Sequence, residues 1–168
     1  MLRPTILLRD LHGDSFASFR QRTQHDFAVA LAKTSSTTIE KAQENACQLF
    51  ARILPEGQRT SGHNFWDIVD PSNGESIGQV WLKTTPKRAN AFLYDLFIDP
   101  LCRHQGFGRA AMTAIESFAH KEGCTLFELH VFPENIAARR LYLGLGYDDT
   151  GAPNVLRKSL PLCPILFP

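Results

Sequence analysis

The stretch that decides the fold reads AFLYDLFIDP (91–100), LCRHQGFGRAAMTAIESFAHKEG (101–123) and CTLFELHVFPENIAARRLYLGLGY (124–147). It predicts a strand, a glycine turn, a helix, a second strand and a short helix. From Phe107 to Ala119 the apolar residues recur at helical spacing, and Gly123 suits the end of that helix. A strand, helix, strand unit of this length predicts two parallel strands joined by a right-handed crossover. Asn135 is placed to cap the short helix that follows, which Gly146 would end.

The turn before the long helix spells Arg103-His104-Gln105-Gly106-Phe107-Gly108-Arg109. Glycines at 106 and 108 carry no Cβ, so backbone N–H groups can approach a bound anion, and the helix adds its positive end. Two arginines flank the turn. The pattern favours a phosphate site, although a plain strand-to-helix turn could use the same residues.

A competing interpretation uses the same glycines. Residues 106–111 also fit GxGxxA, and Glu128 lies 20 residues after Gly108, as in the dinucleotide-binding fingerprint. A dinucleotide-binding sheet normally begins with that unit and repeats it. Here the unit follows about ninety residues and has one crossover, so the doubly wound sheet does not fit.

The residues before this stretch predict a strand, two helices and an antiparallel three-stranded meander. Asn73-Gly74 tolerates the positive φ of a hairpin turn, and Pro55-Glu56-Gly57 would end the second helix. Thr37 or Thr38 would begin that helix. The expected elements are a strand at 5–9, helices at about 15–33 and 38–54, and strands at 63–70, 76–85 and 91–99.

Composition limits the class of protein. With 168 residues, 43% apolar and 21% charged, the chain fits one soluble domain, 1–168. A net charge of +1 predicts no nucleic-acid or membrane partner, and the absence of a membrane-length apolar run favours a cytoplasmic protein. Four cysteines without a CxxC pair predict reduced thiols and no metal site. The apolar tail LPLCPILFP (160–168) is expected to be extended, packed on the domain or on a neighbour.

The strand, glycine turn, helix and second strand described above, taken in this order, resemble the Gcn5-related N-acetyltransferase (GNAT) superfamily. The resemblance covers about 91–147, including RHQGFGR, Asn135, Leu141-Tyr142 and Leu145-Gly146-Tyr147. It implies an α/β (α+β) fold, a mixed and mostly antiparallel sheet with one parallel β-α-β crossover and helices on both faces. It also implies a cofactor-binding core at about 91–147 and an N-terminal half, about 1–90, that shapes the acceptor site.

The resemblance implies acetyl-CoA as cosubstrate, without a metal. In the family the fourth strand splays from the fifth, and the pantetheine arm pairs with the exposed backbone. That role carries over to Leu96, Phe97 and Ile98, and an asparagine contact carries over to Asn135. The pyrophosphate would be held by the turn, with Arg103 at its first position, through His104, Gln105, Gly106, Phe107, Gly108 and Arg109.

The resemblance also implies catalytic roles. Tyr142 takes the position of a tyrosine that protonates the departing thiolate, and Ile98 N–H would polarise the carbonyl. His130 lies where some members place a catalytic glutamate, and its imidazole suits a general base near neutrality. Glu128 shares a strand face with His130, so it could orient the histidine or relay a proton through water. The alternatives to these catalytic roles are that Tyr142 is an aromatic anchor and that His130 is a structural residue. Weaker candidates for the base are Asp95, His63 and His25.

The sequence thus predicts an N-acetyltransferase that moves an acetyl group directly to a primary amine in a ternary complex. Cys102 and Cys124 lack a partner histidine in the sequence, so no acyl-carrying nucleophile is expected. A small-molecule or peptide amine remains open as the acceptor, and a homodimer is possible by analogy. The alternative function is a degenerate member that binds coenzyme A as a sensor or scaffold.

Overall fold

The computed structural model describes residues 4–161. Its helices are α1 (Gly13–Ser35), α2 (Ile39–Ile53), α3 (Phe107–Lys121) and α4 (Ile136–Leu143), with short 3-10 turns at Gly57–Arg59, Pro86–Arg88 and Pro100–Cys102. Its strands are β1 (Leu7–Asp10), β2 (His63–Val69), β3 (Ser76–Thr85), β4 (Asn90–Ile98), β5 (Leu126–His130), β6 (Asp148–Asp149) and β7 (Val155–Ser159).

Local signals explain most of these boundaries. The Thr38 side chain accepts a hydrogen bond from the Lys41 N–H at the start of α2, and Asn135 caps α4 in the same way through Ala138. Gly74 adopts a φ of 75° in the hairpin between β2 and β3. The predicted N-caps and hairpin turn are therefore confirmed.

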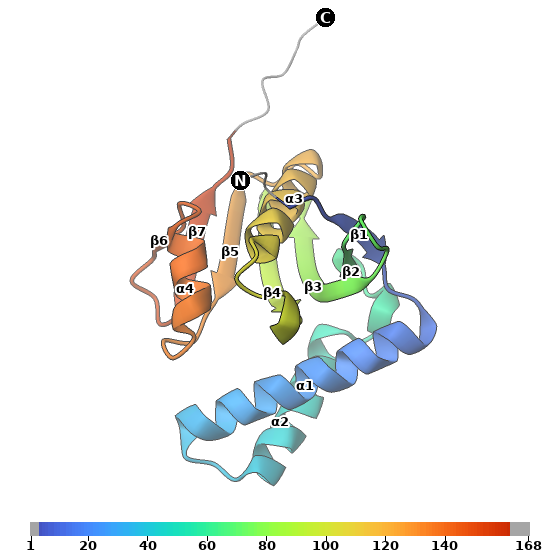
Figure 1. The fold of residues 1–168 in the computed structure, drawn as a ribbon. Helices are drawn as coiled ribbons and strands as arrows, with labels where there is room; N and C mark the ends of the chain where they lie inside the picture. Colours follow the sequence, from blue (N-terminus) through green and yellow to red (C-terminus); the bar gives the residue numbers. More distant parts are fainter. Residues whose placement is uncertain (1–3, 162–168) are drawn as a thin grey trace, which may run out of the picture.

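The seven strands form one sheet in the order β1-β2-β3-β4-β5-β7-β6. The β4–β5 pair is parallel and the other five pairs are antiparallel. This confirms the mixed, mostly antiparallel sheet with a single parallel crossover, which α3 provides. The ribbon shows α3 in front of the sheet, α4 beside β5 and β7, and α1 with α2 together below (Figure 1).

Two cores cover opposite faces of the sheet. One joins α3 and α4 to the sheet, with Met112 and Ile115 packed among residues such as Val80 and Leu129. The other joins α1 and α2 to the opposite face through Phe19, Phe50, Leu54, Phe65 and Trp81. Val80 and Trp81, successive residues of β3, belong to different cores because successive side chains point to opposite faces. Helices on both faces are thus confirmed.

Two predicted boundaries need correction, and two strands were missed. The first strand begins at Leu7, two residues later than expected, and α4 ends at Leu143 with Gly144 as its C-cap, before Gly146. Strands β6 and β7 were not predicted, and β7 pairs with β5. The prediction of an extended apolar tail at 160–168 falls mostly on residues 162–168, which lie outside the described part of the chain.

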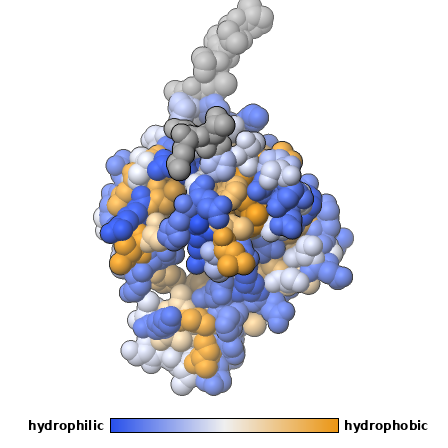
Figure 2. Space-filling model, in the orientation of Figure 1, coloured by the Kyte–Doolittle hydropathy of each residue, from blue (hydrophilic) through white to orange (hydrophobic). Residues whose placement is uncertain are grey.

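The surface is mostly hydrophilic, with separate apolar patches, one of them on the α1–α2 part (Figure 2). Within residues 4–161, no helix is long and apolar enough to cross a membrane. Large exposed apolar side chains include Leu101 and Ile136.

Candidate active site

A gap opens in the sheet where β4 leaves β5. Their parallel pairing runs from Asn90 and Leu126 to Leu93 and Leu129 and then ends, although β4 continues to Ile98. The register between β3 and β4 also shifts there, because Trp81 faces Asp95 whereas Leu82 faces Leu93. Tyr94 is therefore the extra residue of a β-bulge. Bulges re-aim side chains and are frequent beside active sites.

The backbone of β4 beyond the bulge is directed alternately to its two sides. Asp99 N–H donates to the Ile77 carbonyl of the β3 side at 2.9 Å. Alternation along an antiparallel pair then turns the backbone groups of Phe97 to β3 and those of Leu96 and Ile98 to the gap. Of the three predicted residues, Leu96 and Ile98 offer backbone groups there. Phe97 instead presents its ring to Arg22, 4.3 Å from guanidinium carbon to ring centroid.

The glycine turn lies at the C-terminal end of β4 and starts α3. Gly106 is the N-cap with a φ of 89°, and His104 also has a positive φ, 60°. An added Cβ at Gly108 would lie 3.3 Å from a methyl carbon of Leu141. The first N–H groups of α3 have no partner within the helix, so this turn is suited to bind an anion.

Both flanking arginines take part in local structure. Arg103 Nε donates to the Ile98 carbonyl at 2.9 Å, which ties the turn to β4. Arg109 donates to the Gly144 carbonyl from both terminal nitrogens, at 3.2 and 3.3 Å, and so ties α3 to the end of α4. The remaining N–H groups of each guanidinium leave capacity for a phosphate oxygen.

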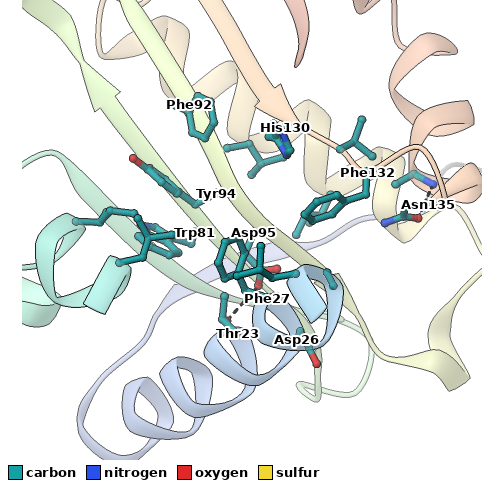
Figure 3. Close-up of a pocket in the computed structure, with 18 of the residues that line it drawn as sticks. Thr23, Asp26, Phe27, Trp81, Phe92, Tyr94, Asp95, His130, Phe132 and Asn135 are labelled. Carbon is teal, nitrogen blue, oxygen red and sulfur yellow. Dashed lines mark hydrogen bonds between the residues drawn. The ribbon is translucent and has the colours of Figure 1, made fainter. Parts of the chain in front are cut away.

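A cavity of about 630 Å³ lies between α1 and α2, the bulged part of β4, and the loop and helix after β5. In Figure 3, Trp81, Tyr94 and Phe92 lie on one side of it, Phe132 and Asn135 on the other, and Asp95 between them. Five predicted residues meet in its lining: Leu96, His130, Asn135, Tyr142 and the weaker base candidate Asp95. The Asn135 Oδ1 atom is used by the cap, at 3.2 Å from Ala138 N, which leaves its amide nitrogen as a donor.

Tyr142 is nearly buried, with 7% of its surface exposed, and it is part of the core around α3. Burial, and to a lesser extent the Asp95 carboxylate, raises its pKa well above the ordinary range. The phenol therefore stays protonated at any physiological pH. Among residues 4–161 no hydrogen bond occupies its hydroxyl, so that group remains available to the cavity.

His130 ends β5, and its ring lies edge-on to Phe132 at 5.3 Å between centroids. Desolvation lowers its pKa, so the imidazole is neutral near pH 7 and able to accept a proton.

Glu128 has different surroundings from those predicted. Its Oε1 accepts hydrogen bonds from Arg157 at 2.9 and 2.6 Å, and its Oε2 accepts one from Asn90 at 2.9 Å. These contacts lower the pKa of Glu128, with the Arg157 hydrogen bond as the main cause. Glu128 does not line the cavity, so the structure brings His130 and Tyr142 together without it. Arg157 lies in the strand that sequence reasoning missed.

Arg22 of α1 makes a polar connection between the helices and the sheet, beside the aromatic core. Its Nη2 donates to Asp95 Oδ2 at 2.7 Å, its Nη1 to Asp26 at 3.2 Å and its Nε to Gln79 at 3.3 Å. Thr23 Oγ1 donates to the same Asp95 oxygen at 3.5 Å. Burial raises the pKa of Asp95, and Arg22 partly offsets that effect. Sequence reasoning missed Arg22, Thr23 and Asp26, and the helical spacing of Phe19, Arg22 and Asp26 was the one available signal.

The other candidates have structural positions. His63 is buried and its Nδ1 accepts from Trp81 Nε1 at 2.8 Å; burial, helped by Lys83, lowers its pKa to about 4. His25 lies in a polar groove with Cys47, away from the cavity. Cys124 is buried and its thiol donates to the Asn90 carbonyl. Among residues 4–161 no cluster of His, Cys, Asp or Glu could hold a metal ion.

Known proteins match both the sequence and the fold. Residues 37–147 match the model of the acetyltransferase (GNAT) family. The Bacillus subtilis protein described as uncharacterized N-acetyltransferase YdgE is 30% identical over 158 residues, which cover 93% of this chain and 98% of that protein. The crystal structure of YycN, also from Bacillus subtilis, has a TM-score of 0.82 at 28% identity and covers 95% of this chain and 99% of that one.

A more distant structure shows the same fold. The PaiA N-acetyltransferase of Thermoplasma acidophilum, in complex with coenzyme A, has a TM-score of 0.68 at 18% identity, over 93% of this chain and 99% of that one. At this identity the likeness concerns the fold alone.

Proposed function

The chain belongs to the acetyltransferase (GNAT) family and is an N-acetyltransferase, and we propose that it transfers an acetyl group from acetyl-CoA directly to a primary amine. The observation that carries the proposal is the gap between β4 and β5, which ends in a cavity lined by Tyr142, His130 and Asn135.

The residues around the gap fit acetyl-CoA. The outward backbone groups of Leu96 can pair with an amide of the pantetheine arm, as an added strand would, and the outward Ile98 N–H lies next along the same edge, toward the thioester. The Asn135 amide can donate to the same arm. The turn from His104 to Arg109, with Arg103, can hold the pyrophosphate on the free N–H groups at the start of α3. When bound, acetyl-CoA supplies the thioester whose acetyl group is transferred.

Starting from the ammonium form of the amine, direct transfer forms one C–N bond, breaks the C–S bond, removes two protons from the nitrogen and adds one to the sulfur, so one proton is released overall. An amine with a pKa of ~10.4 is neutral in only about one molecule in a few thousand at pH 7, so a base near the nitrogen accelerates the reaction. His130, whose imidazole is neutral, accepts one of the two protons from the nitrogen, and the other passes to solvent as the amide forms. Tyr142 donates its hydroxyl proton to the departing sulfur and regains one from solvent. Ile98 N–H donates to the carbonyl oxygen as negative charge develops on it.

The test compares wild type with Tyr142→Phe in a thiol-release assay with acetyl-CoA and a panel of amines. Because the variant lacks only the donated proton, kcat should fall by about 100-fold or more, whereas coenzyme A should bind unchanged by calorimetry. Tyr147→Phe is the matched control, since the Tyr147 hydroxyl donates to Glu116 at 2.9 Å rather than to the cavity.

Two outcomes would contradict the proposal. An unchanged kcat in Tyr142→Phe would exclude the acid role of Tyr142. Tight binding of coenzyme A without turnover of any amine would favour the sensor or scaffold function instead.

A further inference from the structure

The cavity next to Tyr142 and His130 also carries information about the acceptor. Its far end is formed by apolar side chains of the two N-terminal helices, including Phe27 and Leu31 of α1 and Phe50 and Ile53 of α2. Trp81 and Tyr94 form an aromatic wall, with ring centroids 4.3 Å apart and nearly parallel. The bulge in β4 exposes this wall to the cavity, because it turns Tyr94 and Asp95, two successive residues, to the same side.

The charged side chains that line the cavity are negative. Its lining contains two carboxylates, Asp26 and Asp95, and within the described residues it contains no lysine or arginine. The nearest cation, Arg22, already donates to both carboxylates and to Gln79. With both carboxylates ionised, the shared guanidinium leaves about one negative charge, which suits a single ammonium group.

Asp95 lies at the right place to hold that ammonium group. Both hydrogen bonds that it accepts from described residues go to Oδ2, so Oδ1 remains free to accept another. It lines the same cavity as Tyr142 and His130, and in the close-up it lies between Tyr94 and Phe132 (Figure 3). An amine held by Asp95 would therefore have its body in the apolar end and its nitrogen beside the reacting groups.

We propose that the acceptor is a small primary monoamine with an aromatic or branched aliphatic body and no carboxylate. The proposal rests on the function proposed above and names its substrate class. The cavity volume of about 630 Å³ is in the range of small-molecule sites. A carboxylate on the acceptor would face Asp26 and Asp95 with Arg22 already engaged, so amino acids are disfavoured. A polycation would leave its additional charges against apolar walls.

The experiment measures binding by calorimetry to the protein saturated with coenzyme A, which keeps binding separate from turnover. The probes are 2-phenylethylamine, phenylalanine, spermidine and a tripeptide with an N-terminal phenylalanine. We expect 2-phenylethylamine to bind at least 10-fold more tightly than each of the others. Equal affinities, or tighter binding of the amino acid, the polyamine or the peptide, would overturn the proposal.

Asp26→Asn provides a second test, because Asp26 is 55% exposed and the substitution should not affect folding. The loss of one charge should weaken binding of 2-phenylethylamine by about 5-fold and bring phenylalanine closer to it. Asp14→Asn, at the exposed start of α1, is the control and should change neither affinity. An Asp26→Asn variant that behaves like this control would refute the electrostatic part of the proposal.

Thiol release with acetyl-CoA distinguishes the two proposals. If 2-phenylethylamine binds in preference but no amine is acetylated, the acceptor class stands and the proposed reaction fails. If spermidine, phenylalanine or the peptide is acetylated faster than 2-phenylethylamine, the reaction stands and the acceptor class fails.

Discussion

The two halves of the active site are built in different ways. On the donor side, from the end of β4 to α4, most of the groups proposed to bind the cofactor belong to the backbone. Short-range contacts fix several of them: Arg103 reaches Ile98 five residues away, and Asn135 caps Ala138 three residues away. On the acceptor side, between α1, α2 and the bulge of β4, side chains from distant segments meet. Arg22 and Asp95 are 73 residues apart.

This difference has a chemical consequence. Backbone N–H groups at a helix start and at an unpaired strand edge can recognise a constant ligand such as coenzyme A, whatever the neighbouring side chains are. The shape and charge of the acceptor cavity depend on individual side chains such as Trp81, Tyr94 and Asp95. The donor side is therefore expected to withstand changes that abolish acceptor selection. The following predictions test this expectation, from the largest effect to the smallest.

The first prediction concerns His130, where the two sides meet. His130→Gln should lower kcat/KM for the amine by about 100-fold at pH 7, with coenzyme A binding unchanged, because the variant loses only the base. In the wild type, log kcat/KM for the amine falls as the pH decreases because less of the amine is neutral. This fall should become steeper below about pH 6.5, because the pKa of His130 lies below its ordinary value and the imidazole becomes protonated there. In His130→Gln the plot of log kcat/KM against pH should keep one slope, set by the ionisation of the amine alone.

The control for His130 is His25→Gln, on the exposed face of α1 and away from the cavity. It should keep both the rate and the steep acid limb. If His25→Gln loses the acid limb or His130→Gln retains it, His130 is not the base.

The second prediction concerns the acid sensitivity of the acceptor side. His63, in the aromatic cluster with Trp81, has a pKa of about 4 when folded and ~6.5 when unfolded, so between these values the unfolded chain binds more protons. The free energy of unfolding should therefore fall by about 2 to 3 kcal/mol as the pH decreases from about 6.5 to about 4, and be unaffected by His63 above that window. Urea unfolding at several pH values measures it.

A comparison of two variants isolates His63. His63→Gln should show a flatter decline of stability with acid, whereas His12→Gln, on the exposed residue before α1, should behave as wild type. An unchanged decline in His63→Gln would assign the acid sensitivity to other groups.

Sequence reasoning was successful where a local pattern determines the structure. The apolar spacing of α3, the Asn73-Gly74 turn and the Asn135 cap each depend on residues a few positions apart, and all three were confirmed. The short strands β6 and β7 were missed because Asp148–Asp149 and Val155–Ser159 are short and largely polar. They pair because β5 offers a free edge.

The predictions for the site show the same contrast between local and long-range contacts. Tyr142, His130 and Asn135 were named from the resemblance to the GNAT superfamily, and all three line one cavity. Glu128 was expected beside His130 by strand alternation, but Arg157, from the missed strand β7, binds its carboxylate. The bulge at Tyr94 has no signal in the continuous β-rich run AFLYDLFID. The contacts of Arg22 depend on how α1 packs on the sheet, which local sequence does not determine.

The third prediction removes the ion pair that joins Arg22 of α1 to Asp95 of the sheet. Arg22→Met keeps the apolar stem but leaves the Asp95 carboxylate, 21% exposed, without its main partner. We expect a loss of about 2 kcal/mol in the free energy of unfolding. Lys41→Met is the matched control, because its ion pair with Glu44 is more than half exposed and should contribute less than about 0.5 kcal/mol.

The same variant compares the two sides directly. Arg22→Met should raise KM for the amine more than it weakens coenzyme A binding. The hydrogen bonds of Arg22 go to Asp95, Asp26 and Gln79, whereas its contact with the donor strand is the ring of Phe97, which the methionine stem can still cover. Equal losses for both ligands would mean that the two sides are not independent, and the contrast between them would fail.

The last prediction changes the donor side alone, whereas Arg22→Met changes the acceptor side. Gly106 has a φ of 89°, and a side chain there would be strained by about 1 kcal/mol or more, with its Cβ only 3.2 Å from Pro4. Gly151 has a φ of 77° and open space around it, so Gly151→Ala introduces comparable backbone strain far from the turn. Both variants should be slightly less stable than wild type. Gly106→Ala alone should weaken coenzyme A binding, by about 10-fold, because relief of the strain moves the N–H groups that begin α3. Calorimetry with coenzyme A measures the difference, and equal affinities in the two variants would show that the turn does not hold the donor.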